Sequence, residues 1–210
     1  TMEFKTREHW EQVYGTKAPE AVSWYRPHLE ESLRYIRATG LPPDAAVIDV
    51  GGGEATLVDD LLAAGYRDVT VLDISAQALE VCRGRLGSAA ADVSWIAGDI
   101  LDVQLPAARY DIWHDRAVFH FLTDEAARRQ YVAQCFRSLK PGGFAIVGTF
   151  GPEGPEKCSG LTVTRYAPEA LHAEFGPAFE LMSSSTETHR TPWGSEQQFV
   201  YCFCRRGVQD

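Results

Sequence analysis

The strongest constraint on the fold of this chain is a repeated alternation of apolar and helix-forming segments in its middle part. Five apolar runs have the length expected of buried strands: 45–50, 68–72, 93–97, 110–114 and 144–150. Helix-forming segments follow three of them: 54–64, 75–86 and 124–139, the last two with N-caps predicted at Ser75 and Thr123. Because parallel strands need long crossovers, this alternation predicts an α/β fold with a mostly parallel sheet and helices on both faces.

The two ends of the chain depart from this alternation. Segments 179–185 and 198–204 are strand-like, and in the second one Phe199, Tyr201 and Phe203 alternate with Val200, Cys202 and Cys204. This pattern predicts an antiparallel hairpin added to the sheet. Residues 1–40 predict two amphipathic helices joined by a loop at 16–22, ahead of a main unit at 41–210. At about 150 residues per domain, 210 residues make one structural domain.

Composition excludes several classes of partner and location. The chain has 20 Lys and Arg against 29 Asp and Glu, and a net charge of −9 disfavours nucleic acid. An apolar run long enough for a membrane span is missing, and residues 1–5 have no signal-peptide core, so we expect no membrane association. Five cysteines without C-x-x-C spacing predict a reduced, cytoplasmic chain without a metal site.

The sharpest local signal is the sequence Asp49-Val50-Gly51-Gly52-Gly53, where the first strand meets a helix. Glycines there allow a tight turn and let a ligand approach the backbone. An ordinary strand-to-helix turn is the alternative explanation of this loop. Asp73 and Asp99 raise the specificity, because each ends a later strand and would lie on the same edge of the sheet. Ligands bind at that edge in open α/β folds.

Charge separates two kinds of nucleotide ligand. The dinucleotide pattern G-x-G-x-x-G requires a third glycine, where this chain has Thr56. Asp49 would repel a pyrophosphate but would favour a ligand carrying an ammonium or sulfonium group. No Tyr is followed four residues later by Lys, so the pair typical of short-chain dehydrogenases is also missing. These observations favour a cationic nucleoside over a nicotinamide dinucleotide.

The ordered motifs of this chain resemble those of class I S-adenosylmethionine-dependent methyltransferases. The motifs are Asp49-x-Gly51-x-Gly53, Asp73, Gly98-Asp99-Ile100 and Leu139-Lys140-Pro141-Gly142-Gly143. The resemblance covers nearly the whole chain. It implies a Rossmann-like seven-stranded sheet, mostly parallel with an antiparallel last strand, and an enzyme of class EC 2.1.1.- that uses S-adenosyl-L-methionine and releases S-adenosyl-L-homocysteine.

The resemblance also implies roles for the cofactor-binding residues. Asp49 would lie near the methionine amino group, and Gly51, Gly52 and Gly53 would admit the methionine. Asp73 would bind the ribose hydroxyls and Asp99 the adenine amine, with apolar contacts from the residues that follow them, Ile74 and Ile100. Ala55 stands where many members have a third glycine, which weakens the motif slightly.

Residues after the fourth strand lie beside the transferable methyl group in this superfamily. The resemblance therefore points to four polar candidates for the reaction: His114, which would also touch the cofactor, Asp115, Arg116 and His120. A histidine is the usual choice for a general base near neutral pH. The alternative is structural, with an Asp115–Arg116 ion pair and His120 capping the next turn.

Two further groups of residues are candidates for the cavity. The N-terminal aromatic residues Trp10, Tyr14, Trp24 and Tyr25 predict a lid over the cofactor, with Tyr25 also touching the substrate. Simple packing between Trp10 and Tyr14 is the alternative. Phe119 and Cys158 are candidate substrate contacts, Cys158 from a loop at 151–160 that would shape access. A lone loop cysteine is more often incidental.

We expect a methyltransferase acting on a thiol, hydroxyl or amine of a small molecule. A protein-lysine methyltransferase is one alternative, because His9-Trp10-Glu11-x-x-Tyr14 resembles some of them. Those proteins usually have an Asp-Lys-Gly stretch where this chain has Asp115-Arg116-Ala117. A protein that binds a nucleoside without turnover is the other alternative. The sequence predicts no oligomeric state.

Overall fold

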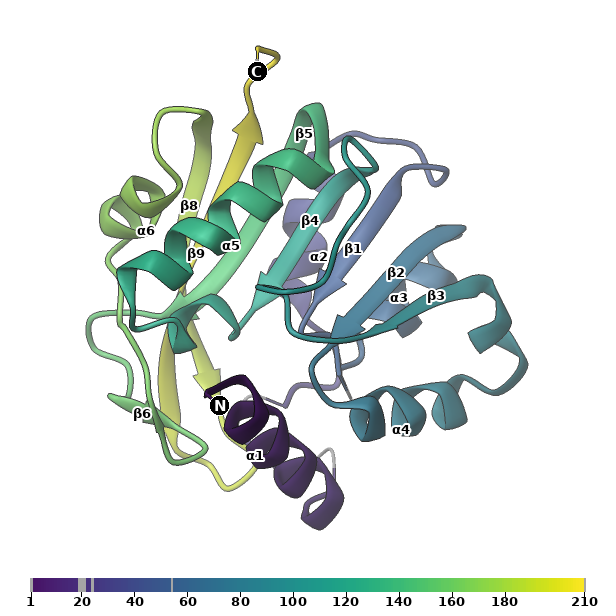
Figure 1. The fold of residues 1–210 in the computed structure, drawn as a ribbon, viewed down its shortest axis with the longest axis vertical. Coiled ribbons are helices and arrows are strands. Elements are labelled where there is room, and N and C mark those ends of the chain that lie inside the picture. Colours follow the sequence, from purple (N-terminus) through teal and green to yellow (C-terminus); the bar gives the residue numbers. More distant parts are fainter. Residues whose placement is uncertain (1, 19–21, 24, 54, 210) are drawn as a thin grey trace.

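A seven-stranded sheet forms the centre of the protein. The computed structural model describes residues 2–18, 22–23, 25–53 and 55–209. The sheet strands are β1 (Ala46–Val50), β2 (Asp68–Asp73), β3 (Val93–Ala97), β4 (Tyr110–Arg116), β5 (Leu139–Phe150), β8 (Phe179–Arg190) and β9 (Glu196–Arg206). Their spatial order is β3-β2-β1-β4-β5-β9-β8 (Figure 1). Pairs from β3 to β5 are parallel, and β9 is antiparallel to both of its neighbours, which confirms the predicted topology.

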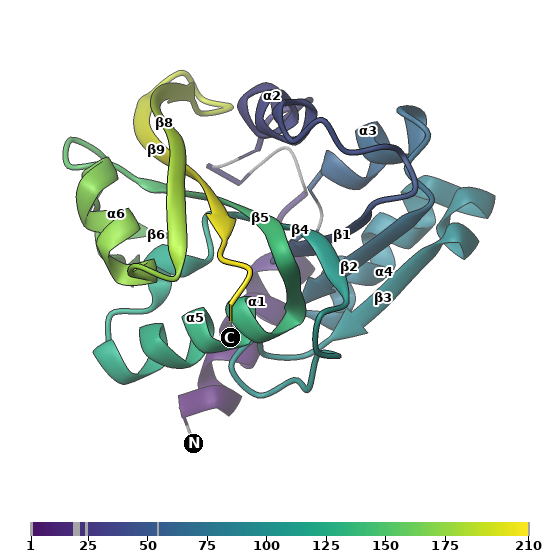
Figure 2. The same ribbon diagram turned by 90° about the horizontal axis from the view of Figure 1, so that it is seen from above.

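Helices cover both faces of the sheet, as predicted (Figures 1 and 2). One face carries α2 (Glu30–Ala38), α3 (Leu57–Ala63) and α4 (Ala76–Leu86), and the other carries α5 (Glu125–Ser138) and α6 (Pro168–Phe175). The predicted alternation in β9 is confirmed. Phe199, Tyr201 and Phe203 belong to the core under α2 to α4, and Val200, Cys202 and Cys204 to the core under α5 and α6.

Small elements complete the chain. Two 3-10 helices are η2 (Gly87–Asp92) and η3 (Phe119–Phe121), and β6 (Lys157–Cys158) pairs with β7 (Leu161–Thr162) in a separate two-stranded sheet. All five cysteines are free and buried. Burial raises the pKa of the Cys158 thiol to about 11.

Several predicted boundaries need correction. The segment predicted as a helix from residue 54 becomes α3 only at Leu57. The N-cap of α5 is Asp124, not Thr123, because the Asp124 carboxylate accepts from the Ala127 N–H. The Ser75 cap of α4 is confirmed by the same kind of contact, with Ala78 as donor. The strand predicted from 144 begins at Leu139, and the one predicted to end at His114 continues to Arg116.

The N-terminal segment crosses the functional edge of the sheet. Helix α1 (Met2–Thr16) lies beyond the carboxyl ends of β1 and β4 and packs against α4 (Figure 1). The connection to α2 is longer than the loop predicted at 16–22. Pro27 disfavours helical backbone at Arg26, so the second helix begins only at Glu30.

Candidate active site

A cavity of about 810 Å³ opens at the carboxyl edge of the sheet. It is lined by the ends of β1, β2 and β4, by the turn after β3, and by α1 and the start of α5. Most of the predicted site residues line it: Trp10, Tyr14, Tyr25, Asp49, Gly51, Gly52, Asp73, Ile74, Asp99, Ile100, His114 and Arg116. Five others do not: Gly53, Asp115, Phe119, His120 and Cys158. Trp24 lies outside the described residues.

The glycine loop is shaped by close contacts that exclude a β-carbon. Gly51 has φ +73°, and a Cβ there would lie 2.0 Å from Val118 Cγ2. Gly53 has φ +38°, and a Cβ would lie 2.7 Å from Asp73 Oδ2. The Gly51 N–H donates to the Leu72 carbonyl at 2.7 Å, which ties the loop to β2. The loop therefore presents bare backbone to the cavity.

Backbone donors orient the two carboxylates at the β2–β3 end of the cavity. Asp73 Oδ1 accepts from the Ser75 N–H at 2.9 Å, and Asp99 Oδ1 accepts from the Leu101 N–H at 2.9 Å. Burial raises the pKa of Asp99. Ile74, Ile100 and Leu101 supply apolar wall between these acceptors. Hydroxyl and amine donors flanking a flat apolar ring would match this arrangement.

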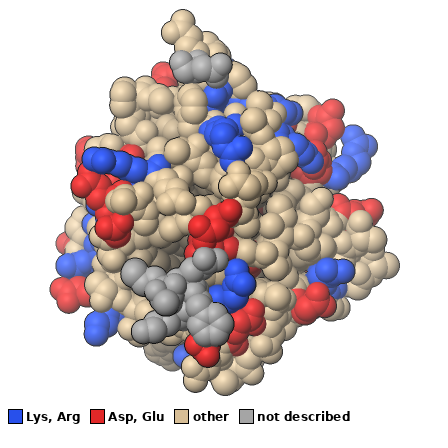
Figure 3. All heavy atoms as spheres, in the orientation of Figure 1, with Lys and Arg blue, Asp and Glu red and all other residues tan. Residues whose placement is uncertain are grey.

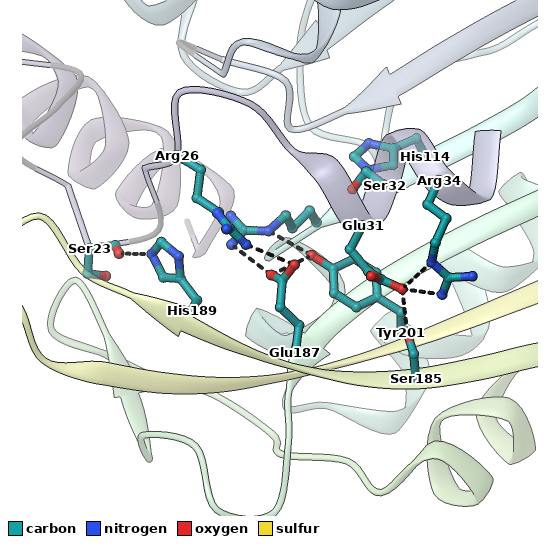
Figure 4. Close-up of polar contacts among 11 residues, drawn as sticks. Ser23, Arg26, Glu31, Ser32, Arg34, His114, Ser185, Glu187, His189 and Tyr201 are labelled. Carbon is teal, nitrogen blue, oxygen red and sulfur yellow. Dashed lines mark hydrogen bonds and ion pairs between the residues drawn. The ribbon is translucent and has the colours of Figure 1, made fainter. Parts of the chain in front are cut away.

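His114 joins β1 to α2 at the floor of the cavity. Its Nδ1 lies 2.8 Å from Asp49 Oδ1, and its Nε2 lies 2.8 Å from Ser32 Oγ (Figure 4). The His114 side chain is 1% exposed and that of Asp49 is 4% exposed. Both ring nitrogens are therefore engaged. The histidine can accept a proton from a ligand only after the Ser32 contact changes.

Strand alternation sends the two residues that end β4 to opposite faces. Arg116 points toward the hairpin, where its Nε donates to Tyr201 Oη at 3.0 Å and its guanidinium lies 4.2 Å from the centre of the Phe199 ring. Asp115 points under α5 instead. Its carboxylate accepts from the Val118 and Phe119 N–H groups and from the Tyr131 hydroxyl. The Asp115 carboxylate therefore shapes the turn after β4 rather than the cavity wall.

Three other candidates lie away from the cavity. His120 is fully buried, its Nδ1 accepts from the Phe150 N–H, and burial together with nearby Arg116 lowers its pKa to about 3. A ring in this state cannot take up a proton at neutral pH. Phe119 packs against Tyr131 in the core under α5. The Cys158 thiol is buried in the opposite core, because β6 turns it inward.

The aromatic residues of α1 both pack together and face the cavity. Trp10 lies 5.9 Å from Tyr14 and 5.1 Å from Phe121, measured between ring centres, and all three line the cavity. Packing between Trp10 and Tyr14 and a position over the cavity, the two alternatives given for this pair, are thus compatible. Sequence reasoning missed Arg26, which also lines the cavity, and Glu187, which binds it at 2.9 Å. No local pattern marks either residue, because they meet across 160 positions of the chain.

On the face shown in Figure 3, Lys and Arg lie in small groups interspersed with Asp and Glu. Within the described ranges, no group of three or more His, Cys, Asp or Glu side chains is arranged to hold a metal ion. No described helix combines the length and apolarity needed to cross a membrane.

Comparisons with known proteins agree with the geometry. A family model described as a methyltransferase domain matches residues 47–143. Human EEF1A lysine methyltransferase 2 is 24% identical over 84% of this chain and 75% of its own length. Mouse eEF1A lysine and N-terminal methyltransferase is 28% identical over 67% of this chain. The match spans only 21% of that mouse protein.

Solved structures share the fold over nearly the whole chain. A structure described as showing conversion of a disulfide bond into a thioacetal group during echinomycin biosynthesis has a TM-score of 0.78, with 20% identity over 98% of this chain and 93% of that one. The 1,6-didemethyltoxoflavin-N1-methyltransferase of Burkholderia thailandensis, with S-adenosylhomocysteine bound, has a TM-score of 0.66, with 19% identity over 97% and 85%.

The sheet order and the glycine loop after β1 define a Rossmann-like fold of the methyltransferase type. Together with the family match, they place the chain in a known group. It belongs to the class I S-adenosylmethionine-dependent methyltransferases.

Replacing Gly51 by Ala tests the glycine loop. The new methyl group would meet Val118 at a left-handed backbone position, so we expect S-adenosylhomocysteine affinity to fall at least ~10-fold, as for ~1.4 kcal/mol of lost binding. Isothermal titration calorimetry measures it. The matched control is Gly40→Ala, which has φ +66° but meets no atom within 4 Å. Equal affinity in the two variants would contradict the close-contact argument.

Replacing Asp115 by Ala tests its structural role. Three donors, two of them in buried hydrogen bonds, would lose their acceptor, so we expect the free energy of unfolding to fall by about 3 kcal/mol. Urea denaturation followed by circular dichroism measures this loss. Asp115→Asn keeps one acceptor oxygen and should lose less. An alanine variant within about 0.5 kcal/mol of the parent would show that the carboxylate is not structural.

Proposed function

We propose that this protein transfers the methyl group of S-adenosylmethionine to a thiol, hydroxyl or amine of a small molecule. The main support is that one continuous cavity joins the Asp73–Asp99 end to the Arg116 end. Its volume, about 810 Å³, lies in the upper part of the range for small-ligand pockets. This leaves room for a second small molecule beside a nucleoside.

The residues at the β2–β3 end fit the proposed cofactor. Asp73 offers carboxylate oxygens for ribose hydroxyls, and Asp99 offers one for an adenine amine. Gly51 and Gly52 allow close approach of the methionine part, and Asp49 supplies a negative charge near its ammonium and sulfonium groups. When bound, S-adenosylmethionine supplies a methyl group that its sulfonium already makes electrophilic.

The chain itself must then align the acceptor and exclude water. In this proposal α1 and the residues up to 40 form a lid, with Trp10 and Tyr14 covering the nucleoside and Tyr25 beside the acceptor. The main unit, 41–210, supplies the floor through His114. A thiol or phenol acceptor needs little help to ionise, so Asp49 and His114 can serve mainly to fix the floor.

A protein-lysine acceptor is the second candidate, and the names of the sequence relatives support it. Against it stands the cavity wall beside His114, where Arg116 would meet a lysine side chain. A nucleoside-binding protein without turnover has less support, because the cavity continues well past the nucleoside end.

The cofactor proposal predicts a thermal shift. S-adenosylhomocysteine at 100 times its Kd should stabilise the fold by about 2.7 kcal/mol and raise the melting temperature, whereas NAD should not. Asp73→Asn should remove most of the shift, because it loses a carboxylate oxygen that faces the cavity. Asp44→Asn, at an exposed loop position, is the control. A shift with NAD alone would overturn the proposal.

The acceptor proposal predicts where a labelled methyl group goes. With tritiated S-adenosylmethionine, we expect label in the small-molecule fraction of a cell extract and not in its protein fraction. Label confined to protein would favour the lysine alternative. A normal thermal shift with no transfer to either fraction would favour a binding protein.

A further inference from the structure

We infer that the methyl acceptor carries a carboxylate or a similar anionic group, which binds Arg26 and Arg116 at the end of the cavity away from the nucleoside. The inference rests on the proposed function, because it assumes that an acceptor enters this cavity. It also favours a small-molecule acceptor over a protein lysine.

The charged residues that line the cavity are segregated. Carboxylates lie at the β1–β3 end and at the start of α5: Asp49, Asp73, Asp99, Asp102 and Asp124. The start of α5 belongs to this end, because Gln130 in its second turn donates to the Leu101 carbonyl after β3. Within the described lining, the guanidinium groups of Arg26 and Arg116 lie at the other end, against the β8–β9 hairpin.

Arg116 is a cation held in one orientation. Its side chain is 4% exposed, its Nε donates to Tyr201 Oη at 3.0 Å, and its plane lies over the Phe199 ring. Burying a charge is costly, so such a guanidinium needs anionic partners. A planar fork fixed by packing is also pre-organised to bind a carboxylate.

In the part of the chain that the structure describes, the Glu187 carboxylate lies near both arginines. Glu187 Oε2 lies 2.9 Å from Arg26 Nη1 (Figure 4). Glu187 Oε1 lies 3.9 Å from Arg116 Nη2. The close contact is therefore with Arg26, and the Arg116 contact is long. Among the described residues, two guanidinium groups face this one carboxylate, so the described lining of this end carries more positive than negative charge.

Two described neighbours, Glu31 and His189, do not cancel this excess. The Glu31 carboxylate already binds Arg34 and accepts from Ser185 Oγ (Figure 4). His189 is fully buried and bonded to the Ser23 carbonyl through Nε2, and its pKa is lowered to about 4 by burial and then by Arg116. A neutral imidazole adds no charge, and the charge of Arg116 contributes to its lowered pKa after burial, the larger cause.

This excess of positive charge favours an anionic acceptor and opposes a cationic one. A carboxylate placed between Arg26 and Arg116 would balance the local charge with strong, charge-assisted hydrogen bonds. A lysine ammonium in the same place would be repelled by two guanidinium groups. The apolar residues beside them, Val22, Leu29 and Leu161, would cover the body of the acceptor.

Binding of small probes to the protein saturated with S-adenosylhomocysteine tests the inference without turnover. Benzoate, benzamide and benzylamine share one ring and differ in charge. We expect calorimetry to show the tightest binding for benzoate. Benzamide should bind at least ~10-fold more weakly, because one charged contact is lost, and benzylamine should show no measurable binding. Equal binding of benzoate and benzamide would overturn the inference. Failure to load S-adenosylhomocysteine would instead overturn the proposed function.

Variants of Arg26 and Arg116 test whether these two residues bind the benzoate carboxylate. Arg116→Gln and the less buried Arg26→Gln should each weaken benzoate binding at least ~10-fold. Glu187→Gln should tighten it, because the competing carboxylate is removed. Arg83→Gln, on the outer surface of α4, is the matched control. Unchanged benzoate affinity in both arginine variants would contradict the inference.

The same variants separate the acceptor from the cofactor's own carboxylate. If the arginines bind the acceptor, the affinity for S-adenosylhomocysteine should stay within about twofold of the parent in Arg26→Gln and Arg116→Gln. If they bind the methionine carboxylate, that affinity should fall while binding of 5′-methylthioadenosine, which lacks the amino acid, stays constant. The second result would overturn the inference.

Discussion

The site depends on the way β4 alternates its side chains at the carboxyl edge of the sheet. His114 and Arg116 point to the face of α2 and the hairpin, where both line the cavity. Asp115 points to the face of α5 and holds the following turn through two backbone N–H groups. That turn carries Val118, whose methyl group lies against Gly51. One strand thus positions the polar floor and the neighbouring glycine loop together.

Charge along the edge follows the order of the strands. Carboxylates from β1 and β2 and from the turn after β3 form a negative end, and the guanidinium groups beside β9 form a positive end. A sulfonium nucleoside and an anionic acceptor would each meet the opposite charge, with the reacting atoms between them. This arrangement explains why a net charge of −9 is compatible with a positively charged end of the cavity.

Much of the fold could be predicted because its signals are local. Apolar runs located the strands, Ser75 marked a cap, and the period of two in 199–204 assigned the faces of β9. The cavity position of Asp73 and Asp99 followed from strand ends alone. Asp115 and His120 could not be placed in this way, because a residue's face and burial depend on the packing of α5 and η3.

Residues that act across long sequence distances were beyond sequence reasoning. Arg26 and Glu187 meet only because the hairpin extends to Arg190 and folds back beside the loop before α2. A longer hairpin than predicted therefore brought an unpredicted pair into the cavity. The predicted N-cap of α5 was wrong by one residue, because Thr123 and Asp124 are adjacent and both residue types cap helices well.

The hairpin of β8 and β9 lies at the outer edge of the sheet, and only β5 joins it to the parallel strands. It contributes Glu187, Phe199 and Tyr201 around Arg116, and none of the glycine loop or its acidic neighbours. Substitutions in this one peripheral element would therefore alter the surroundings of Arg116 and leave the glycine loop and its acidic neighbours unchanged.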